Sequence, residues 1–267
     1  MGLLDGKNAL IFGVANKNSI AWGIVQKLHE EGANIALSYA GEALEKRVRP
    51  LAEAVDCTFV EQCDVTNDDE LDAVFDKYAE EIGTIDILVH SVAYAPKEDL
   101  DGRMVDVSRD GFLLALNVSA YSLIAMIKRA EPLMPESGGS IMSMTYHASR
   151  KVMVRYNAMA VAKAALETVT QYLAADLGPK NIRVNAISAG PIKTLAAAGI
   201  PGFRKMLKMS EEAAPMRRLV TQEEVGKTAV WLASDWSSAV TGEVIYVDGG
   251  YHVLGMTLTE EQRDEMM

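Results

Sequence analysis

The sequence predicts an α/β fold, a single doubly wound Rossmann-type domain with a seven-stranded parallel sheet and helices on both faces. Short apolar runs alternate along the chain with longer segments of helical periodicity. The short runs are apolar along their whole length, which is typical of strands that are covered on both faces. Because no linker rich in Pro, Gly or Ser divides the 267 residues, we expect one domain over residues 1–267.

Seven short apolar runs are the expected strands. The first, NALIF, leads directly into Gly13 and a helical segment, as at the first turn of a nucleotide-binding unit. The later runs, such as NIALSY and IRVNAI, have the same length and apolar character. The expected strands are residues 8–12, 34–39, 58–62, 85–91, 139–144, 182–187 and 243–247.

The segments between these runs have the spacing of helices. The last expected helix has a clear start, because Thr221 and Glu224 have the spacing of a capping box. Residues 188–212 break the alternation and are expected to be irregular, with a binding loop or helical insertion at about 193–212. The expected helices are residues 20–31, 42–55, 68–82, 109–133, 157–177 and 221–233.

Composition excludes several classes of function. A formal net charge of −11 argues against general binding of nucleic acid or anionic membranes. Cys57 and Cys63 have the spacing of neither a disulfide framework nor a zinc site, so we expect no metal. No secretory signal is visible, and no apolar run approaches membrane-spanning length. We therefore expect a cytoplasmic protein.

The first strand–turn–helix junction is a candidate phosphate site. Gly13 lets the backbone turn sharply, and the following helix offers free N–H groups to a pyrophosphate. Ser19 and Ile20 lie at the start of that helix. The three-glycine fingerprint is absent, so a plain tight turn is an equally good explanation of this segment on its own.

Residues after the other early strands also favour a dinucleotide. Asp64 could accept the adenine amino group, although a turn or N-cap aspartate explains it equally well. The small run Ser91–Val92–Ala93 permits close passage of a ribose. The second strand ends without Arg or Lys, so a 2′-phosphate would lack its usual partner, and the ribose-binding acid is missing or replaced by Glu42. The sequence thus favours NADH over NADPH.

Tyr156 and Lys163 are the candidate catalytic pair. They are seven positions apart, about two helical turns. If Lys163 lies on a helix that begins near Tyr156, its ammonium can point toward the phenol and favour the phenolate. This pair predicts a reduction site beside a bound nucleotide.

The motifs together resemble the enoyl-acyl carrier protein reductases, a divergent branch of the short-chain dehydrogenase/reductase superfamily. The resemblance spans nearly the whole chain. Ordinary superfamily members have Tyr and Lys with three residues between them, whereas six separate Tyr156 from Lys163 here and Tyr146 stands ten positions upstream. The resemblance rests on Gly13…Ser19-Ile20-Ala21…Gly23, Cys63-Asp64-Val65, His90-Ser91-Val92-Ala93, Tyr146…Tyr156…Lys163, residues 183–196 and Val247-Asp248-Gly249-Gly250.

The resemblance implies reduction of the carbon–carbon double bond of trans-2-enoyl thioesters on acyl carrier protein with NADH, the last reductive step of type II fatty acid elongation. It implies that Tyr146, Tyr156 and Lys163 are the catalytic residues. The cofactor-binding residues it implies are Gly13, Ser19, Ile20, Asp64, Val65, Ser91, Val92, Ala93, Lys163, Ile192, Thr194 and Ala196. The substrate-binding residues it implies are Ala93, Tyr94, Tyr146, Tyr156, Met159, Ala196, Ile200, Phe203 and Met206.

The same resemblance places a substrate loop at residues 195–209, where apolar side chains could close over an acyl chain. An ordinary amphipathic helix explains Met206 equally well. Arg204, Lys205 and Lys208 form a basic cluster that could dock an acidic carrier protein, or simply a solvated helix face. His147 departs from the family pattern, and we expect it to face solvent rather than shape the pocket.

The resemblance also implies a homotetramer, whose assembly surface includes residues 220–251. Two other functions remain open at this point. One is a carbonyl or hydroxyl dehydrogenase of the same superfamily, against which the Tyr–Lys spacing speaks. The other is a nucleotide-binding regulator without catalysis, which would need neither Tyr156 nor Lys163.

Overall fold

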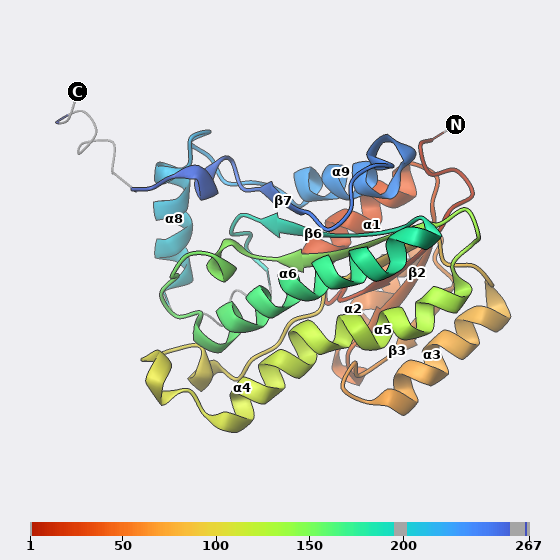
Figure 1. Ribbon diagram of the computed structural model, residues 1–267, viewed down its shortest axis with the longest axis horizontal. Coiled ribbons are helices and arrows are strands. Elements are labelled where there is room, and N and C mark those ends of the chain that lie inside the picture. The colour runs from red at the N-terminus through yellow and green to blue at the C-terminus, as the bar shows by residue number, and fades with distance from the viewer. Residues whose placement is uncertain (1, 195–201, 257–264, 266–267) are drawn as a thin grey trace.

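The computed structural model describes residues 2–194, 202–256 and 265. Seven strands form one sheet in the order β3-β2-β1-β4-β5-β6-β7, and every pair of neighbours is parallel (Figure 1). This confirms the predicted doubly wound sheet. The strands are β1 (Asn8–Phe12), β2 (Asn34–Tyr39), β3 (Phe59–Gln62), β4 (Ile87–His90), β5 (Gly139–Thr145), β6 (Ile182–Ala189) and β7 (Val244–Val247).

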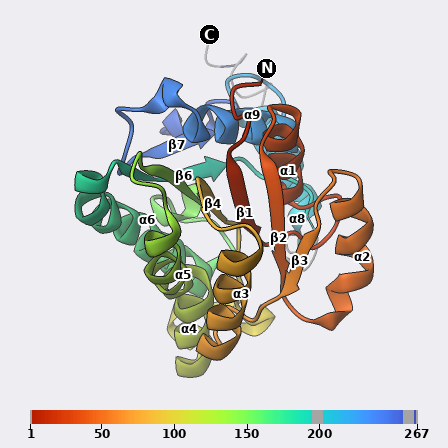
Figure 2. The same cartoon turned by 90° about the vertical axis from the view of Figure 1, so that its right-hand side faces the viewer.

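Helices cover both faces of the sheet (Figure 2). One apolar core joins the strands to α1, α2 and α9, and a second joins them to α3, α5 and α6. β1 to β6 therefore have an apolar core on each side, which explains why these strands are apolar, while the edge strand β7 is half-buried against the first core. The helices are α1 (Ile20–Glu30), α2 (Glu42–Glu53), α3 (Asp68–Glu81), α4 (Arg109–Leu116), α5 (Ser122–Ala130), α6 (Asn157–Leu177), α8 (Phe203–Ala213) and α9 (Gln222–Ala233).

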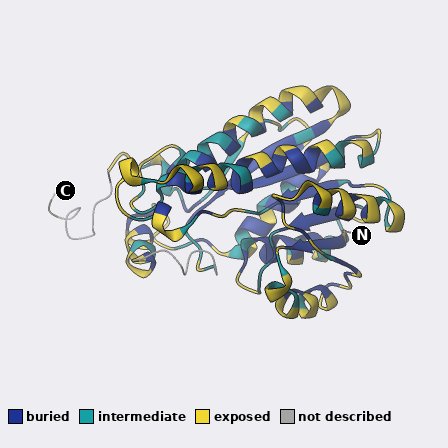
Figure 3. Ribbon diagram, turned by 90° about the horizontal axis from the view of Figure 1, so that it is seen from below, coloured by how far each residue is buried: buried dark blue, intermediate teal, exposed yellow. Residues whose placement is uncertain are grey.

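Burial follows this layering (Figure 3). The central strands are buried almost throughout, the edge strands β3 and β7 are partly exposed, and the helices expose their outer faces. The contact between α1 and α9 needs two glycines, because a Cβ on Gly23 would lie 2.6 Å from the Gln222 carbonyl oxygen and one on Gly226 would lie 2.4 Å from the Gly23 carbonyl oxygen. Gly23 thus serves helix packing.

The long apolar segment over 109–133 is helical, as predicted, but it is interrupted. A π-turn at Asn117–Tyr121 joins α4 to α5, and a short 3₁₀ turn ends the run at Leu133. An 18-residue window within Arg109–Leu133 has a mean hydropathy of 1.6, so the segment is long and apolar enough to span a membrane, and the expectation that no run approaches that length is wrong. Because 56% of that window is buried inside the protein, the segment has the character of a core helix.

Element boundaries agree closely with the predictions, with one exception. β1, β2 and α6 have the predicted bounds, and the capping box of Thr221 and Glu224 is present. The exception is the stretch 188–212, which is predicted to be irregular with a binding loop or helical insertion at about 193–212; α8 agrees with the helical insertion. The first two residues of this stretch belong to β6, and its end contains most of α8, an amphipathic helix.

Candidate active site

A cavity of about 730 Å³ opens at the carboxyl ends of β1, β4, β5 and β6. It extends from the end of β2 to α8, which stands beyond the strand ends (Figure 1). This is the edge at which open α/β sheets bind ligands. The predicted site residues that line it are Gly13, Ser19, Ile20, Val65, Ser91, Val92, Ala93, Tyr94, Tyr146, Tyr156, Met159, Lys163, Ile192, Thr194, Phe203 and Met206.

Three of the predicted cofactor- and substrate-binding residues are not among these. Ala196 and Ile200 lie outside the described residues. Asp64 lies between two lining residues, but its Oδ1 accepts hydrogen bonds from the Thr66 backbone N–H at 2.9 Å and the Thr66 hydroxyl at 2.8 Å. This is the turn role that we weighed against adenine binding, and the adenine contact stays a prediction.

The loop after β1 is shaped by two residues. Gly13 has φ +107°, and a Cβ there would lie 2.1 Å from the Ser91 carbonyl oxygen. Only glycine therefore fits where the ends of β1 and β4 meet. The Ser19 hydroxyl accepts hydrogen bonds from the backbone N–H groups of Ala15 and Asn16, at 3.0 and 3.1 Å, and so folds the loop against the start of α1.

The end of β2 contributes a residue that sequence reasoning missed. Ser38 is buried and lines the cavity, and its hydroxyl has no hydrogen-bond partner among the described residues. A buried polar atom without a partner is expected to bind a ligand or water. Glu42, considered as a ribose-binding acid, is exposed and does not line the cavity.

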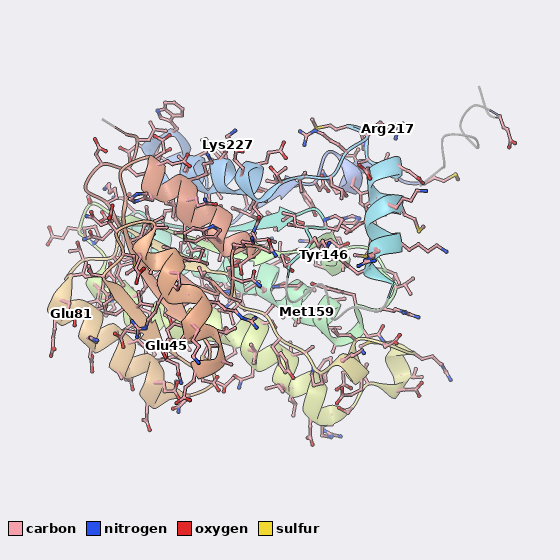
Figure 4. All side chains as sticks on the ribbon, turned by 180° about the vertical axis from the view of Figure 1, so that it is seen from behind. Glu45, Glu81, Tyr146, Met159, Arg217 and Lys227 are labelled. Atoms are coloured by element: carbon pink, nitrogen blue, oxygen red, sulfur yellow. The ribbon has the colours of Figure 1, made fainter. Side chains whose placement is uncertain are left out.

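The two tyrosines meet at the other end of the cavity. Tyr146 follows β5 and Tyr156 is the N-cap residue of α6. Their ring centroids are 5.1 Å apart in an edge contact, with an angle of 67° between the planes. Figure 4 shows Tyr146 and Met159 at the end of the molecule that α8 flanks.

Burial decides the protonation of both phenols. It raises the pKa of Tyr146 and of Tyr156 well above the usual value of a tyrosine. The expectation that Lys163 favours a phenolate is therefore wrong, because desolvation dominates over any effect of the cation. Both phenols are neutral at physiological pH and available as hydrogen-bond donors.

Lys163 lies on α6 and is 4% exposed. Its ammonium donates a hydrogen bond to the Met144 carbonyl oxygen at 2.6 Å. Burial lowers its pKa to about 8, and the nearby Glu167 carboxylate opposes this shift. The ammonium is thus mostly charged at neutral pH, and it points to the end of β5 while lining the same cavity as Tyr156.

His147 does not face solvent as expected. It is 7% exposed, and its ring packs edge-on against Tyr246 and Tyr251, with centroids 6.3 and 5.9 Å away. It does not line the cavity. His147 lies in the 3₁₀ turn His147–Ser149, whose orientation could not be predicted from residue types alone.

α8 forms the outer wall. Phe203 and Met206 line the cavity, and Phe203 is buried. Arg204, Lys205 and Lys208 are exposed, and Lys208 lies 3.6 Å from Glu212. The segment is thus an amphipathic helix whose apolar side chains Phe203 and Met206 face the cavity, and its closure over an acyl chain stays a prediction.

The charge of the lining limits the possible chemistry. Among the described lining residues, the charged ones are Lys97 and Lys163, and none is a carboxylate. Two neutral phenols and a buried ammonium surrounded by apolar walls can stabilise negative charge that develops on a substrate oxygen. They offer no carboxylate for general base catalysis.

Comparisons with known proteins agree with this geometry. Residues 13–252 match the family described as "Enoyl-(Acyl carrier protein) reductase". The chain is 53% identical over 257 residues to "Enoyl-[acyl-carrier-protein] reductase [NADH] FabI" of Bacillus cereus, covering 96% of this chain and 100% of that one.

Solved structures give the same result. The crystal structure of the Bacillus cereus reductase with NADP+ and indole naphthyridinone has a TM-score of 0.94 at 53% identity, covering 96% of this chain and 100% of that one. The Anaplasma phagocytophilum reductase in complex with NAD has a TM-score of 0.93 at 45% identity, covering 97% and 98%. The chain therefore belongs to the enoyl-acyl carrier protein reductase family.

Proposed function

We propose that this protein reduces the carbon–carbon double bond of trans-2-enoyl thioesters carried by acyl carrier protein, with NADH as reductant. This is the last reductive step of type II fatty acid elongation. The observation that carries the proposal is the edge contact of Tyr146 and Tyr156 in the cavity that Lys163 also lines. The names of the relatives, which specify NADH, support the same reaction.

The described residues fit a dinucleotide. The partnerless hydroxyl of buried Ser38 fits a polar group of the adenosine half. Gly13, Ser19 and Ile20 would hold the pyrophosphate with Thr194, and Ile192 would contact the nicotinamide carboxamide through its backbone. Lys163 would hold the ribose hydroxyls next to the nicotinamide.

The mechanism follows from the protonation states. NADH, when bound, supplies the hydride that reaches C3 of the enoyl group. Negative charge then collects on the thioester oxygen, and the neutral Tyr156 hydroxyl donates a hydrogen bond to it. Tyr146 holds the Tyr156 ring in place through the edge contact and forms a wall of the acyl site. A proton taken up from solvent water then adds at C2 of the enolate and completes the saturation.

The acyl chain would lie against the apolar end of the cavity. Tyr94, Met159, Phe203 and Met206 line that end. Apolar walls exclude water from the hydride path and favour a long hydrocarbon chain. The predicted contacts of Ala196 and Ile200 lie outside the described residues.

Three further assignments belong to this proposal. The exposed cations Arg204, Lys205 and Lys208 on α8 would dock the acidic carrier protein. The chain would assemble as a homotetramer, with residues 220–251 in the assembly surface. The enzyme would act in the cytoplasm, where the other enzymes and the carrier of the cycle would also be found.

The competing function is reduction of a carbonyl or oxidation of a hydroxyl group. Following the loss of NADH absorbance with crotonyl thioester, and in parallel with simple ketones, separates the two. We expect turnover with the thioester alone. Turnover with ketones alone would replace the proposal, and NADH binding without turnover on any enoyl thioester would indicate a regulator instead of an enzyme.

A further inference from the structure

A buried carboxylate lies next to the catalytic residues and has no part in the mechanism above. Glu167 is on α6, four positions after Lys163, and it is 1% exposed. A glutamate in a helix usually faces water, and burying its charge is costly unless several donors satisfy it. The environment of Glu167 therefore calls for an explanation.

The donors to Glu167 come from both sides of Tyr146. Its Oε1 accepts hydrogen bonds from the Thr145 hydroxyl at 2.8 Å and from the Ser149 hydroxyl. Its Oε2 accepts one from Arg150 Nε at 2.8 Å. Thr145 precedes Tyr146 directly, and the other two donors follow it at the end of the turn. One carboxylate thus fixes both ends of the segment that presents the Tyr146 ring.

α6 holds the end of β5 at two neighbouring points. Lys163 donates to the Met144 carbonyl oxygen, and one helical turn later Glu167 accepts from Thr145. Tyr156 is the N-cap residue of the same helix. Consequently the positions of Tyr146, Tyr156 and Lys163 relative to one another all depend on how β5 sits on α6.

We propose that Glu167 is a positioning residue, which clamps the Tyr146 segment to α6 and keeps the neighbouring Lys163 ammonium charged. This inference rests on the function proposed above. The residue acts through Tyr146 and Lys163, and it does not line the cavity.

The charges around Lys163 support the proposal that Glu167 keeps its ammonium charged. Burial lowers the pKa of Lys163, and the Glu167 carboxylate is the one group that raises it again. Apart from the Arg150 cation, the neighbouring groups add little charge, since burial keeps His90 neutral by lowering its pKa to about 3 and keeps the tyrosines neutral by raising theirs. Among the described residues, the titratable groups that interact electrostatically with Lys163 or Glu167 are His90 on β4, His147 after β5, Arg150 and Tyr246 on β7, and Tyr146 and Tyr156 line the same cavity as Lys163.

The test is the variant Glu167→Gln, which keeps the size and one acceptor but removes the charge. The dissociation constant of NADH and kcat with crotonyl thioester are measured from pH 6 to pH 10. NADH affinity and kcat should both decline as the Lys163 ammonium loses its proton. We expect the pH of this decline to be about one unit lower in the variant than in the wild type, the shift expected when an opposite charge is lost. Above that pH the variant would be about tenfold less active than the wild type.

A second variant should shift the pH of the decline in the opposite direction. Arg150→Gln removes the cation that partly neutralises Glu167, so the same decline should move to higher pH, by less because the Arg150 side chain is 55% exposed. A residue with only a structural role would lower stability in both variants without shifting the two profiles in opposite directions.

The matched control is Asp86→Asn. Asp86 is also a largely buried carboxylate, which accepts hydrogen bonds from the Lys7 ammonium and the Asn8 backbone N–H at the opposite edge of the sheet. It should lower the melting temperature and leave the pH profile unchanged. A wild-type profile in Glu167→Gln, or in Arg150→Gln if the first variant does not fold, would overturn the proposal. Wild-type turnover on the thioester tests the proposed function separately.

Discussion

Two helices line the same cavity but differ in how they are held. α6 has 21 residues, lies against β5 and β6, and is tied to the end of β5 by Lys163 and by Glu167. α8 has 11 residues, of which three are buried, and stands beyond the strand ends after the undescribed residues 195–201 (Figure 1). The helix that carries the proposed catalytic residues is thus fixed to the sheet, whereas α8 contributes Phe203 and Met206 to the cavity from beyond the strand ends.

This difference separates two requirements of the reaction. Hydrogen bonds that stabilise a transition state must be held within fractions of an ångström, which demands buried anchors. Admission of a long acyl chain demands a wall that contributes apolar surface without such anchors. Substitutions on α6 should therefore act on turnover and cofactor affinity, and those on α8 on the Michaelis constant of the substrate.

The largest effect is expected for Tyr156→Phe. Without the hydroxyl, the charge on the thioester oxygen loses its donor, and kcat should fall about a hundredfold. The dissociation constant of NADH, measured by fluorescence, should change less than about twofold because the ring itself is kept. Unchanged turnover would show that Tyr156 has no part in the mechanism, and that α6 does not hold the donor to the thioester oxygen.

The second largest effect is expected for Lys163→Met, which keeps the aliphatic stem and removes the charge. The dissociation constant of NADH should rise about tenfold, the value of one hydrogen bond to a charged group. In the wild type, the pKa of Lys163 is about 8, so the ammonium is present below that pH and is lost above it. NADH affinity should accordingly fall as the pH rises through 8, and a flat profile would contradict this role.

A smaller effect is expected on α8. Reversing the charge of Arg204 and Lys205 to Glu should raise the Michaelis constant of carrier-linked substrate about three- to tenfold, because the carrier is acidic. A coenzyme A thioester should be affected much less. The matched control reverses Lys46 and Arg47, which are exposed on α2. Equal effects on both substrates would indicate a solvated helix face.

The smallest effect is expected outside both helices and provides a baseline. Thr221→Ala removes the N-cap of α9 and should lower the free energy of unfolding by about 1 kcal/mol. Chemical denaturation measures this loss. Because α9 does not line the cavity, kcat and the Michaelis constants should remain those of the wild type. A kinetic change would show that stability alone explains part of the effects on α6.

Much of the fold was predictable because local patterns and tertiary structure agree. β1, β2 and α6 have their predicted bounds. For the two strands the reason is that short apolar runs between Gly-containing turns have few alternatives to buried strands. α8 was less predictable, because its apolar side chains are interspersed with charged ones in a long stretch without a capping signal. Its amphipathic pattern was visible, but only the family resemblance indicated that Phe203 and Met206 would face the cavity.

At the site, the spacing of residues along the sequence predicted which side chains lie close together, but not whether those side chains are charged or neutral. The Tyr156–Lys163 spacing correctly placed both side chains in one cavity. It could not reveal that burial outweighs the cation at the phenol, since burial depends on the surrounding elements. Ser38 and Glu167 were missed for the same reason: a serine at a strand end and a glutamate in a helix carry no signal until packing removes their water.

The most direct test of the central claim is a crystal structure of the protein with bound NADH. We expect the nicotinamide to lie against Tyr156, in the cavity at the carboxyl ends of β4 and β5. The Lys163 ammonium should donate hydrogen bonds to the hydroxyls of the adjacent ribose. A nicotinamide bound away from Tyr156, or a Lys163 side chain turned away from the cofactor, would contradict this expectation.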